Sequence, residues 1–396
     1  MTARPHKVCF ISPLGYGLYS PKGGYPFGGA EVQFYLLANQ LAQDVTFEVS
    51  VLTTVREDSG REQYGALRVF TRKGRDRLAL PVGMSLASWM SRIAGFLRAF
   101  LEMGCQLRQI DADVFLHAGA GVEVGAYALL CRLMRKRFIF FIASSADLSG
   151  SQGAVTGPLK WLFPLGVRLA HAVVCRTVDQ QSLLQARYRR SGVLIRTGHP
   201  LPPRQAVPGP YVLWVGRGNP LKQPEMFLDL AGRMPRHRFV MVIAREDLHF
   251  DLLTKVRARA AMLGNLELYE DVSWSKIDNY FARARVFVNT STYEGFPNTF
   301  VQAALHGAPV VSWRVDPDQL LSSRQLGLCA GDSLDRLVDL VQGLCESETD
   351  WRTLSQDVER YALTHHLLSV SAGALKALLC SLDNRSLSRL NQELSA

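Results

Sequence analysis

The 396 residues are enough for two domains of ordinary size, and a hydrophobic content of 47% can supply a core for each of them. This composition argues against a largely disordered chain, and no uninterrupted apolar run of about 18 residues predicts a membrane-spanning helix. The formal net charge of +10 favours an acidic partner, which leaves anionic membrane, nucleic acid, anionic substrate or a merely solvated basic surface open. Nucleic acid is the weakest of these, because neither zinc-finger spacing nor an aromatic single-strand platform accompanies the charge.

The cysteines argue against a zinc site. There are seven, an odd number, spread widely and without a Cys-x-x-Cys pair. Reduced thiols in a cytoplasmic protein are the simplest interpretation. The first residues run straight into a short strand pattern instead of a signal-peptide apolar region. We therefore expect a cytoplasmic protein, either soluble or peripheral at the inner face of the membrane.

Strand and helix patterns alternate along the first half of the chain. Short apolar runs predict buried strands at residues 8–11, 47–52, 114–116, 138–142, 173–175 and 193–195. Helical periodicity separates most of them, at residues 30–41, 84–107, 125–134 and 179–188. Such alternation predicts parallel βαβ units. A proline-rich stretch follows, with Pro200, Pro202, Pro203, Pro208 and Pro210.

The alternation then restarts. Apolar runs predict strands at residues 211–215, 239–243, 266–269, 286–288 and 310–313. The fold class is therefore α/β, with two Rossmann-like doubly wound domains. We predict an N-terminal domain over residues 1–199, a linker over residues 200–210 and a C-terminal domain over residues 211–396, because a run so rich in proline is neither helix nor central strand.

The segment 293–313 carries the strongest functional signal. The predicted strand at 286–288 stops in a polar turn that presents Glu294 at its carboxyl end. Asn298 or Thr299 can cap the helix that follows, and Gly307 ends that helix. Open α/β sheets bind ligands at the carboxyl ends of their strands, and a helix amino terminus attracts phosphate. A carboxylate beside such a phosphate site suggests a phosphorylated, hydroxyl-rich ligand.

This segment is similar to the signature of retaining glycosyltransferases of family 4, which have the GT-B fold. The signature places two glutamates eight positions apart around Gly-Phe-Pro; Glu294 fills the first position, but Gln302 fills the second. The chain thus departs from the family where relatives usually hold the nucleotide ribose. The resemblance implies two domains facing a central cleft, the first binding the acceptor and the second the nucleotide sugar. It also implies that the final helical stretch, residues 363–382, crosses back to the first domain.

Two cations follow the first strand of the second domain. Arg217 and Lys222 lie five positions apart on a glycine-containing turn. A guanidinium holds phosphate oxygens through a planar fork, while an ammonium adds a compact charge. The pair resembles the one that grips the donor diphosphate in the family, although any surface turn can carry Arg and Lys.

Glycines at 23, 24, 28 and 29 lie between the first strand and the first helix. Gly28 and Gly29, followed by Ala-Glu and an amphipathic helix, resemble the first-domain loop that faces donor phosphate and acceptor in the family. Glycine permits close backbone approach to a ligand, but a flexible connecting loop is the alternative. We interpret Glu31, in the first turn, as a partner of the helix dipole.

Three further polar residues are open to two interpretations. His117, at the end of a predicted strand, either contacts the transferred sugar, as the resemblance implies, or is structural. Asp147 either contacts the acceptor or caps a turn. Gln302 lies off the apolar stripe of its helix, which predicts exposure to the cleft and a hydrogen bond from a neutral amide to the ribose.

The predicted function is transfer of a hexosyl or related sugar, with retention, from a nucleotide diphosphate sugar to a hydroxyl acceptor such as a lipid-linked or polysaccharide precursor. The predicted catalytic residues are Glu294, Arg217 and Lys222. The predicted substrate-binding residues are Gly28, Gly29, His117, Gly295, Phe296, Asn298, Thr299 and Gln302. No Asp-x-Asp or histidine cluster points to a metal, so we expect a metal-independent reaction without a cofactor.

Other classes stay open. A catalytically silent sugar or nucleotide binding module retains the same loops, and a GT-B epimerase or phosphorylase is a nearer rival. The basic amphipathic stretch at residues 84–108, with Trp89, Phe96 and Phe100, either docks at anionic lipid carrying the acceptor or is a helix of the domain core.

Overall fold

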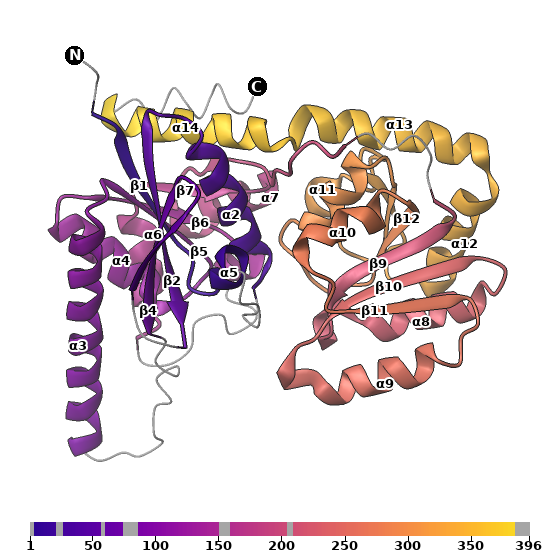
Figure 1. Ribbon diagram of the computed structural model, residues 1–396, viewed down its shortest axis with the longest axis horizontal. Helices are drawn as coiled ribbons and strands as arrows, with labels where there is room; N and C mark the ends of the chain where they lie inside the picture. The colour runs from indigo at the N-terminus through magenta and orange to yellow at the C-terminus, as the bar shows by residue number, and fades with distance from the viewer. Residues whose placement is uncertain are drawn as a thin grey trace. The chain divides into compact units, whose positions relative to one another are not determined.

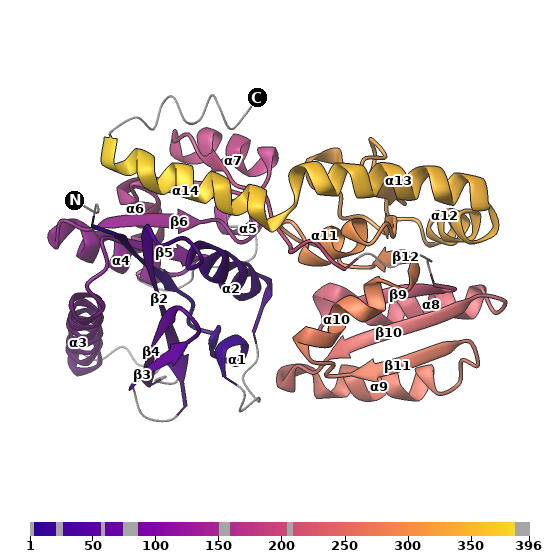
Figure 2. The same ribbon diagram turned by 45° about the horizontal axis from the view of Figure 1, so that its top comes forward.

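The computed structural model describes residues 4–20, 27–56, 60–73, 86–149, 159–203 and 209–384. The chain forms two compact units: Met1–Ile195 together with Ser371–Ala396, and Arg196–Val370. Each unit is a mainly parallel β-sheet with helices packed on it, which confirms the predicted α/β class (Figures 1 and 2). Pro208 of the predicted linker lies outside the described residues.

The first unit has an eight-stranded sheet in the order β3-β4-β2-β1-β5-β6-β7-β8. Its strands are β1 (His6–Ile11), β2 (Phe47–Val55), β3 (Gly60–Tyr64), β4 (Leu67–Lys73), β5 (Val114–Ala118), β6 (Arg137–Phe141), β7 (Ala172–Cys175) and β8 (Val193–Leu194). Only β3 runs antiparallel to its neighbour. The helices are α1 (Tyr16–Tyr19), α2 (Gly29–Leu41), α3 (Leu86–Ile110), α4 (Val122–Leu133), α5 (Ser145–Ser149), α6 (Leu162–Leu169), α7 (Val178–Tyr188) and most of α14 (Leu368–Asn384).

The second unit has a six-stranded, fully parallel sheet in the order β11-β10-β9-β12-β13-β14. Its strands are β9 (Tyr211–Arg217), β10 (Arg238–Ala244), β11 (Leu266–Glu270), β12 (Ala284–Asn289), β13 (Val310–Ser312) and β14 (Gly327–Cys329). The helices are α8 (Pro224–Arg233), α9 (Phe250–Ala260), α10 (Trp274–Phe281), α11 (Asn298–Leu305), α12 (Leu334–Glu346) and α13 (Glu348–His365), with 3-10 turns η1 (Pro220–Lys222), η2 (Asp247–His249) and η3 (Pro317–Gln319).

The strand order of the second unit reverses at β9. From β9 the chain adds β10 and β11 on one side and then crosses to place β12, β13 and β14 on the other. Loops at such a switch point diverge beyond the carboxyl ends of the strands and leave room for a ligand. A site is therefore expected at the loops after β9 and β12. In the first unit the equivalent reversal lies between β1 and β5.

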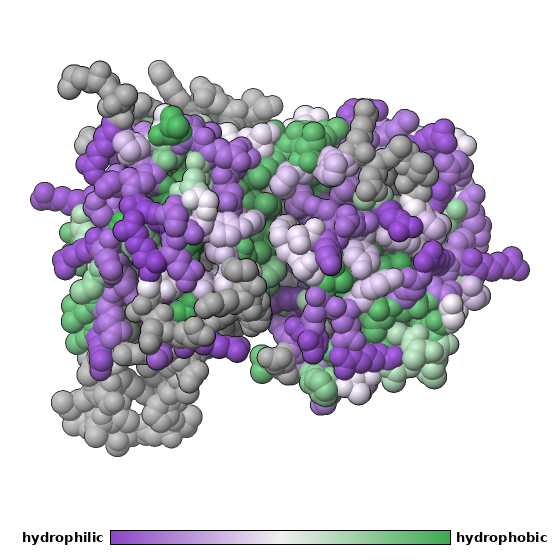
Figure 3. Space-filling model, in the orientation of Figure 1, coloured by the Kyte–Doolittle hydropathy of each residue, from purple (hydrophilic) through white to green (hydrophobic). Residues whose placement is uncertain are grey.

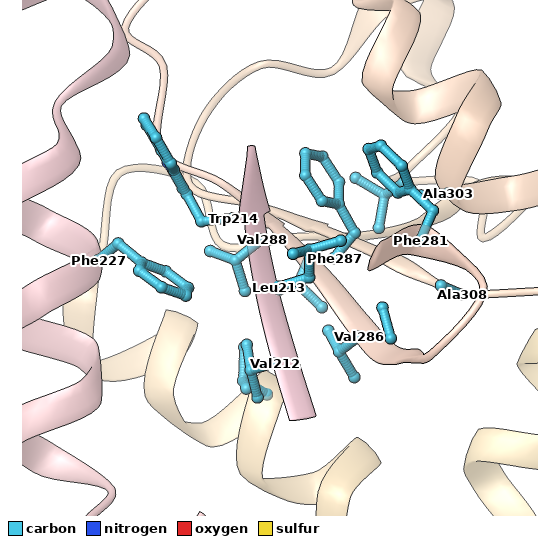
Figure 4. Close-up of a cluster of buried hydrophobic side chains, with 14 of the residues drawn as sticks. Val212, Leu213, Trp214, Phe227, Phe281, Val286, Phe287, Val288, Ala303 and Ala308 are labelled. Atoms are coloured by element: carbon cyan, nitrogen blue, oxygen red, sulfur yellow. The ribbon is translucent and has the colours of Figure 1, made fainter. Parts of the chain in front are cut away.

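The core of the second unit lies around its central strands. Val212 and Leu213 of β9 lie beside Val286 and Val288 of β12 in Figure 4, and all four side chains are buried. Strands covered by helices on both faces have continuous apolar sequences, which is why the apolar runs in the sequence predicted them. On the face drawn in Figure 3, by contrast, hydrophilic residues cover much of the described surface, with hydrophobic patches between them.

The last helical stretch is broken, contrary to the single helix predicted at residues 363–382. α13 ends at His365 and α14 begins at Leu368. The backbone of His199 occupies the break: its N–H donates to the carbonyl of His366 at 2.9 Å, and its carbonyl accepts from the N–H of Leu368 at 2.8 Å. A distant segment thus replaces hydrogen bonds that a continuous helix would make.

The basic stretch at residues 84–108 is helical over α3, but only part of its surface is described. The side chains of Trp89 and Phe96 lie outside the described residues, and Phe100 packs against the core of the first unit. Leu97 and Leu101, one turn apart, are more than half exposed. No helix in the described ranges combines the length and the apolar character needed to cross a membrane.

Candidate active site

The loop after β9 is a short, tightly packed turn that ends at Lys222. Asn219 begins η1, and its side-chain oxygen accepts the N–H of Lys222 at 3.2 Å. Its amide nitrogen donates to Glu246 Oε2 at 2.7 Å. Gly216 leaves room for the indole of Trp214, because a Cβ there would lie 2.8 Å from the ring. These contacts hold Lys222 in one position beside the end of the strand.

The loop after β12 is tied to this turn through Thr290. Its hydroxyl accepts from Trp214 Nε1 at 2.9 Å and donates to the carbonyl of Lys222 at 2.7 Å. The N–H of Thr292 also donates to the carbonyl of Leu221 at 2.9 Å. Thr290 and Trp214 are both buried, so these bonds are shielded from competing water. The two loops of the switch point therefore form one fixed platform.

Lys222 and Glu294 meet on this platform as an ion pair between Nζ and Oε1. Ser291 Oγ donates to the same carboxylate oxygen at 2.8 Å. The Lys222 and Glu294 side chains are 22% and 17% exposed, so both reach the surface while their positions are fixed. The structure thus brings together two predicted catalytic residues that lie 72 positions apart.

Arg217, the third predicted catalytic residue, lies at the end of β9 and pairs with a different carboxylate. Its Nη1 is 3.4 Å from Glu246 Oε1, and half of its side chain is exposed. Glu246 therefore receives both Arg217 and Asn219. An exposed guanidinium paired this loosely can turn to an anionic ligand at small cost.

Helix α11 begins at Asn298, four residues after Glu294. Its N-cap is Pro297 and no side chain caps it, so the prediction that Asn298 or Thr299 would do so is wrong. The cause is that both residues already lie within the first turn of the helix. Gly295, Asn298 and Thr299 are half-buried. A helix start without a capping side chain attracts an anionic group through its amides and dipole.

Phe296 and Gln302 are buried, not displayed to a ligand. Phe296 stacks on the ring of His366, with centroids 4.9 Å apart. Gln302 is 3% exposed, and its Nε2 donates to Asp278 Oδ1 on α10 at 2.9 Å. The prediction that Gln302 is exposed is therefore wrong, because a neighbouring helix covers the face of α11 that the sequence left polar.

In the first unit, Gly28 is the N-cap of α2 and Gly29 begins that helix. The N–H of Gly28 donates to Glu31 Oε2 at 3.0 Å, which agrees with the predicted role of Glu31 at the helix start. A Cβ at position 28 would lie 2.8 Å from the same oxygen. The backbone is therefore closely covered by its own capping carboxylate. Gly23 and Gly24 lie outside the described residues.

His117 lies within β5 at the switch point of the first sheet and is buried. Its Nδ1 donates to the carbonyl of Ile11 at 3.3 Å, and its Nε2 is 3.9 Å from Glu123 Oε1. Burial lowers the pKa of His117, which Glu123 partly opposes. Asp147 accepts the N–H groups of Ala143 and Ser144 at 2.9 and 3.0 Å, so it closes a turn.

Several site residues were not named from the sequence. Thr290 and Ser291 lie in the polar turn that ends β12, and Asn219 precedes a proline, which is a turn signal that could have drawn attention to it. Nothing local indicated Glu246 or Asp278. Within the described part of the chain, no group of three or more His, Cys, Asp or Glu is arranged to hold a metal ion.

Comparison with known proteins agrees with this geometry. Residues 209–347 match the family model described as Glycosyl transferases group 1. That range contains both loops of the platform and α11. A sucrose-phosphate synthase from Thermosynechococcus elongatus superposes with a TM-score of 0.74 at 16% identity, over 96% of this chain and 100% of that one. The chain has the GT-B fold of glycosyltransferases.

Two further solved structures share this fold. HepE of Anabaena, in complex with UDP and glucose, gives a TM-score of 0.67 at 16% identity and covers 95% of this chain and 100% of its own. A trehalose-phosphate synthase from Burkholderia xenovorans, in complex with glucose-6-phosphate, gives 0.70 at 11% identity, over 94% of this chain and 100% of its own.

One curated relative is similar over a shorter stretch. The Vi polysaccharide biosynthesis protein VipC/TviE of Salmonella typhi is 35% identical over 96 residues, which is 23% of this chain. The match spans only 16% of the length of that relative.

Proposed function

We propose that this protein is a retaining glycosyltransferase that moves a sugar from a nucleoside diphosphate sugar to a hydroxyl acceptor. The observation that carries the proposal is the Lys222–Glu294 ion pair, held on a rigid platform at the switch point of the second sheet, with Glu294 four residues before α11. The cation and the helix start match the diphosphate of such a donor, and the carboxylate matches its sugar hydroxyls.

Each proposed catalytic residue has a separate role in the transfer. During transfer the bond from the anomeric carbon to the diphosphate oxygen breaks, and a bond from that carbon to the acceptor oxygen forms on the same face. Lys222 and Arg217 stabilise the charge that grows on the leaving diphosphate, and this electrostatic effect is usually the largest in catalysis. Glu294 orients the sugar and supports the positive charge on its ring. The leaving phosphate takes the acceptor proton.

The proposed substrates follow from the relatives and the first unit. A UDP-bound neighbour and a relative concerned with Vi polysaccharide biosynthesis support a hexosyl donor and a polysaccharide or lipid-linked precursor as acceptor. Gly28 and Gly29, at the start of α2, are assigned to the donor phosphate and the acceptor, and His117 is assigned to the transferred sugar. Because Arg217 and Lys222 supply the positive charge, the proposal needs no metal or other cofactor and expects transfer to survive EDTA.

The test is transfer by full-length variants with nucleoside diphosphate sugars. Lys222→Ala and Glu294→Ala should each lower kcat/KM at least about a hundredfold, or about 2.7 kcal/mol, while circular dichroism stays that of the folded protein. The matched control is the surface ion pair of Arg259 and Asp229 in the same unit, whose alanine variants should keep full activity. Wild-type rates in either site variant would overturn the assignment.

A further inference from the structure

Asp278 on α10 is a half-exposed carboxylate held by the amide of a buried side chain. Its side chain is 41% exposed, and its Oδ1 accepts the amide of Gln302 at 2.9 Å. Gln302 itself is buried, and its Nε2 is the donor in this bond. A buried amide that reaches across to a neighbouring helix fixes the carboxylate in one orientation. The other carboxylate oxygen has no hydrogen-bond partner within the described chain.

A second buried group faces the same carboxylate. His199 is 3% exposed, its Nδ1 lies 3.3 Å from the carbonyl of Pro200, and a carbonyl can only accept, so Nδ1 carries the proton. Its Nε2 lies 3.9 Å from Asp278 Oδ1 and has no hydrogen-bond partner among the described residues. Burial lowers the pKa of both His199 and His306, and Asp278 opposes this shift in each. The carboxylate of Asp278 thus acts on both buried histidines.

The position of Asp278 suits a ligand bound at the start of α11. Helices α10 and α11 lie side by side (Figures 1 and 2), joined by the bond from Gln302 to Asp278. Gln302 is four residues into α11 from Asn298, which at about 1.5 Å per residue is about 6 Å along the helix. A nucleotide whose phosphates meet the helix start would extend its sugar over about this distance.

We propose that Asp278 binds the ribose hydroxyls of the donor nucleotide, with Gln302 as its positioning residue. A carboxylate accepts from two hydroxyls at once and carries full charge, whereas the amide of Gln302 carries none. Nucleotide-binding α/β sheets repeatedly place an acidic side chain on the ribose near a phosphate-binding helix start. The carboxylate absent at position 302 is thus supplied from the next helix. This inference rests on the proposed function.

A purely structural role for Asp278 predicts something different. If the bond to Gln302 only ties α10 to α11, removing it lowers the thermal unfolding temperature but leaves the choice between ribose and deoxyribose unchanged. The decisive quantity is therefore the ratio of affinities for a ribonucleotide and its 2′,3′-dideoxy counterpart. That ratio reports contact with the hydroxyls and is independent of a general loss of stability.

The experiment is calorimetric titration of the full chain with UDP, GDP and ADP and with their 2′,3′-dideoxy forms. Wild type should bind its preferred ribonucleotide at least about tenfold more tightly than the 2′,3′-dideoxy form, a difference of about 1.4 kcal/mol in binding free energy. Asp278→Ala should bring the ratio close to one, and Asp278→Asn serves if the alanine variant does not fold. The matched control is Asp357→Ala on α13, an exposed acidic residue paired with Arg360, which should keep the wild-type ratio.

A swap sharpens the test. Gln302→Glu alone sets two carboxylates against each other and should weaken nucleotide binding. Gln302→Glu with Asp278→Asn keeps the hydrogen bond but moves the charge to the buried position, so the ribose preference should stay lost. An unchanged ratio in Asp278→Ala, with nucleotide still bound, overturns the inference and leaves the proposed function standing. A wild-type protein that binds none of the ribonucleoside diphosphates overturns both.

Discussion

The hydroxyl of Thr290 joins the two loops of the candidate active site, so its removal tests how the platform is held together. Thr290→Val keeps the shape of the side chain and removes only the hydroxyl. Two bonds disappear: the one from Trp214 Nε1 at 2.9 Å and the one to the carbonyl of Lys222 at 2.7 Å. Because Thr290 is fully buried, water cannot replace them without opening the loops.

The expected loss follows from these two bonds. Leaving a buried donor such as the Trp214 indole unpaired costs about 1–3 kcal/mol, and losing the bond to the Lys222 carbonyl costs about 1 kcal/mol more. The free energy of unfolding of the second unit should therefore fall by about 2–4 kcal/mol. Transfer should fall as well, because the bond to the carbonyl of Lys222 helps to hold its ammonium beside Glu294.

The assay is urea unfolding of the full chain, followed by tryptophan fluorescence and circular dichroism so that transitions of the two units are resolved. Trp214→Phe supplies the control, since it removes the donor that Thr290→Val leaves unpaired. In the Trp214→Phe background, Thr290→Val should lower the free energy of unfolding by at least about 1 kcal/mol less than it does in wild type. A difference of this size is the coupling energy expected for residues in contact. A loss below about 0.5 kcal/mol, or an equal loss in both backgrounds, would refute this account of the platform.

Two further predictions concern stability. Burial lowers the pKa of His366 from 6.5 to about 3. Below pH 6.5 this side chain is therefore protonated in the unfolded chain but stays neutral in the folded chain. His366 alone should therefore lower the free energy of unfolding by about 1 kcal/mol per pH unit as the pH falls from 6.5 towards 3, and His366→Phe should flatten the slope by that amount in acid unfolding followed by circular dichroism. A Cβ at Gly216 would lie 2.8 Å from the Trp214 ring, so Gly216→Ala should cost about 1–3 kcal/mol in thermal unfolding. Gly264→Ala, with nothing within 4 Å, is the control, and equal stability of the two variants would contradict the packing argument.

The sequence predicted those parts of the fold that depend on local patterns. The apolar runs at residues 8–11 and 286–288 lie within β1 and β12, because strands buried on both faces are apolar throughout. The strands β3 and β4 were not predicted. β3 is polar and mostly exposed, and it pairs with β4 at the sheet edge through backbone bonds that leave no apolar signature.

The parts that were missed depend on contacts between distant segments. Helical periodicity at residues 363–382 was genuine, but the break between α13 and α14 is made by His199, far away along the chain. The polar position of Gln302 was also read correctly as lying off the apolar stripe. What covers that position is Asp278 on another helix, and no local pattern reports a partner 24 residues away.

Position 302 shows how a departure from a family pattern can be interpreted physically. Taken alone, glutamine in place of glutamate removes a charge and suggests weaker ribose binding. In the folded unit the amide of Gln302 is buried and points at the carboxylate of Asp278, which is half exposed. A glutamate at 302 would instead place two carboxylates within hydrogen-bond distance of each other, which is unfavourable in a partly buried site. Gln302 and Asp278 are therefore best understood as a pair. A neutral amide at position 302 allows the negative charge to lie on α10.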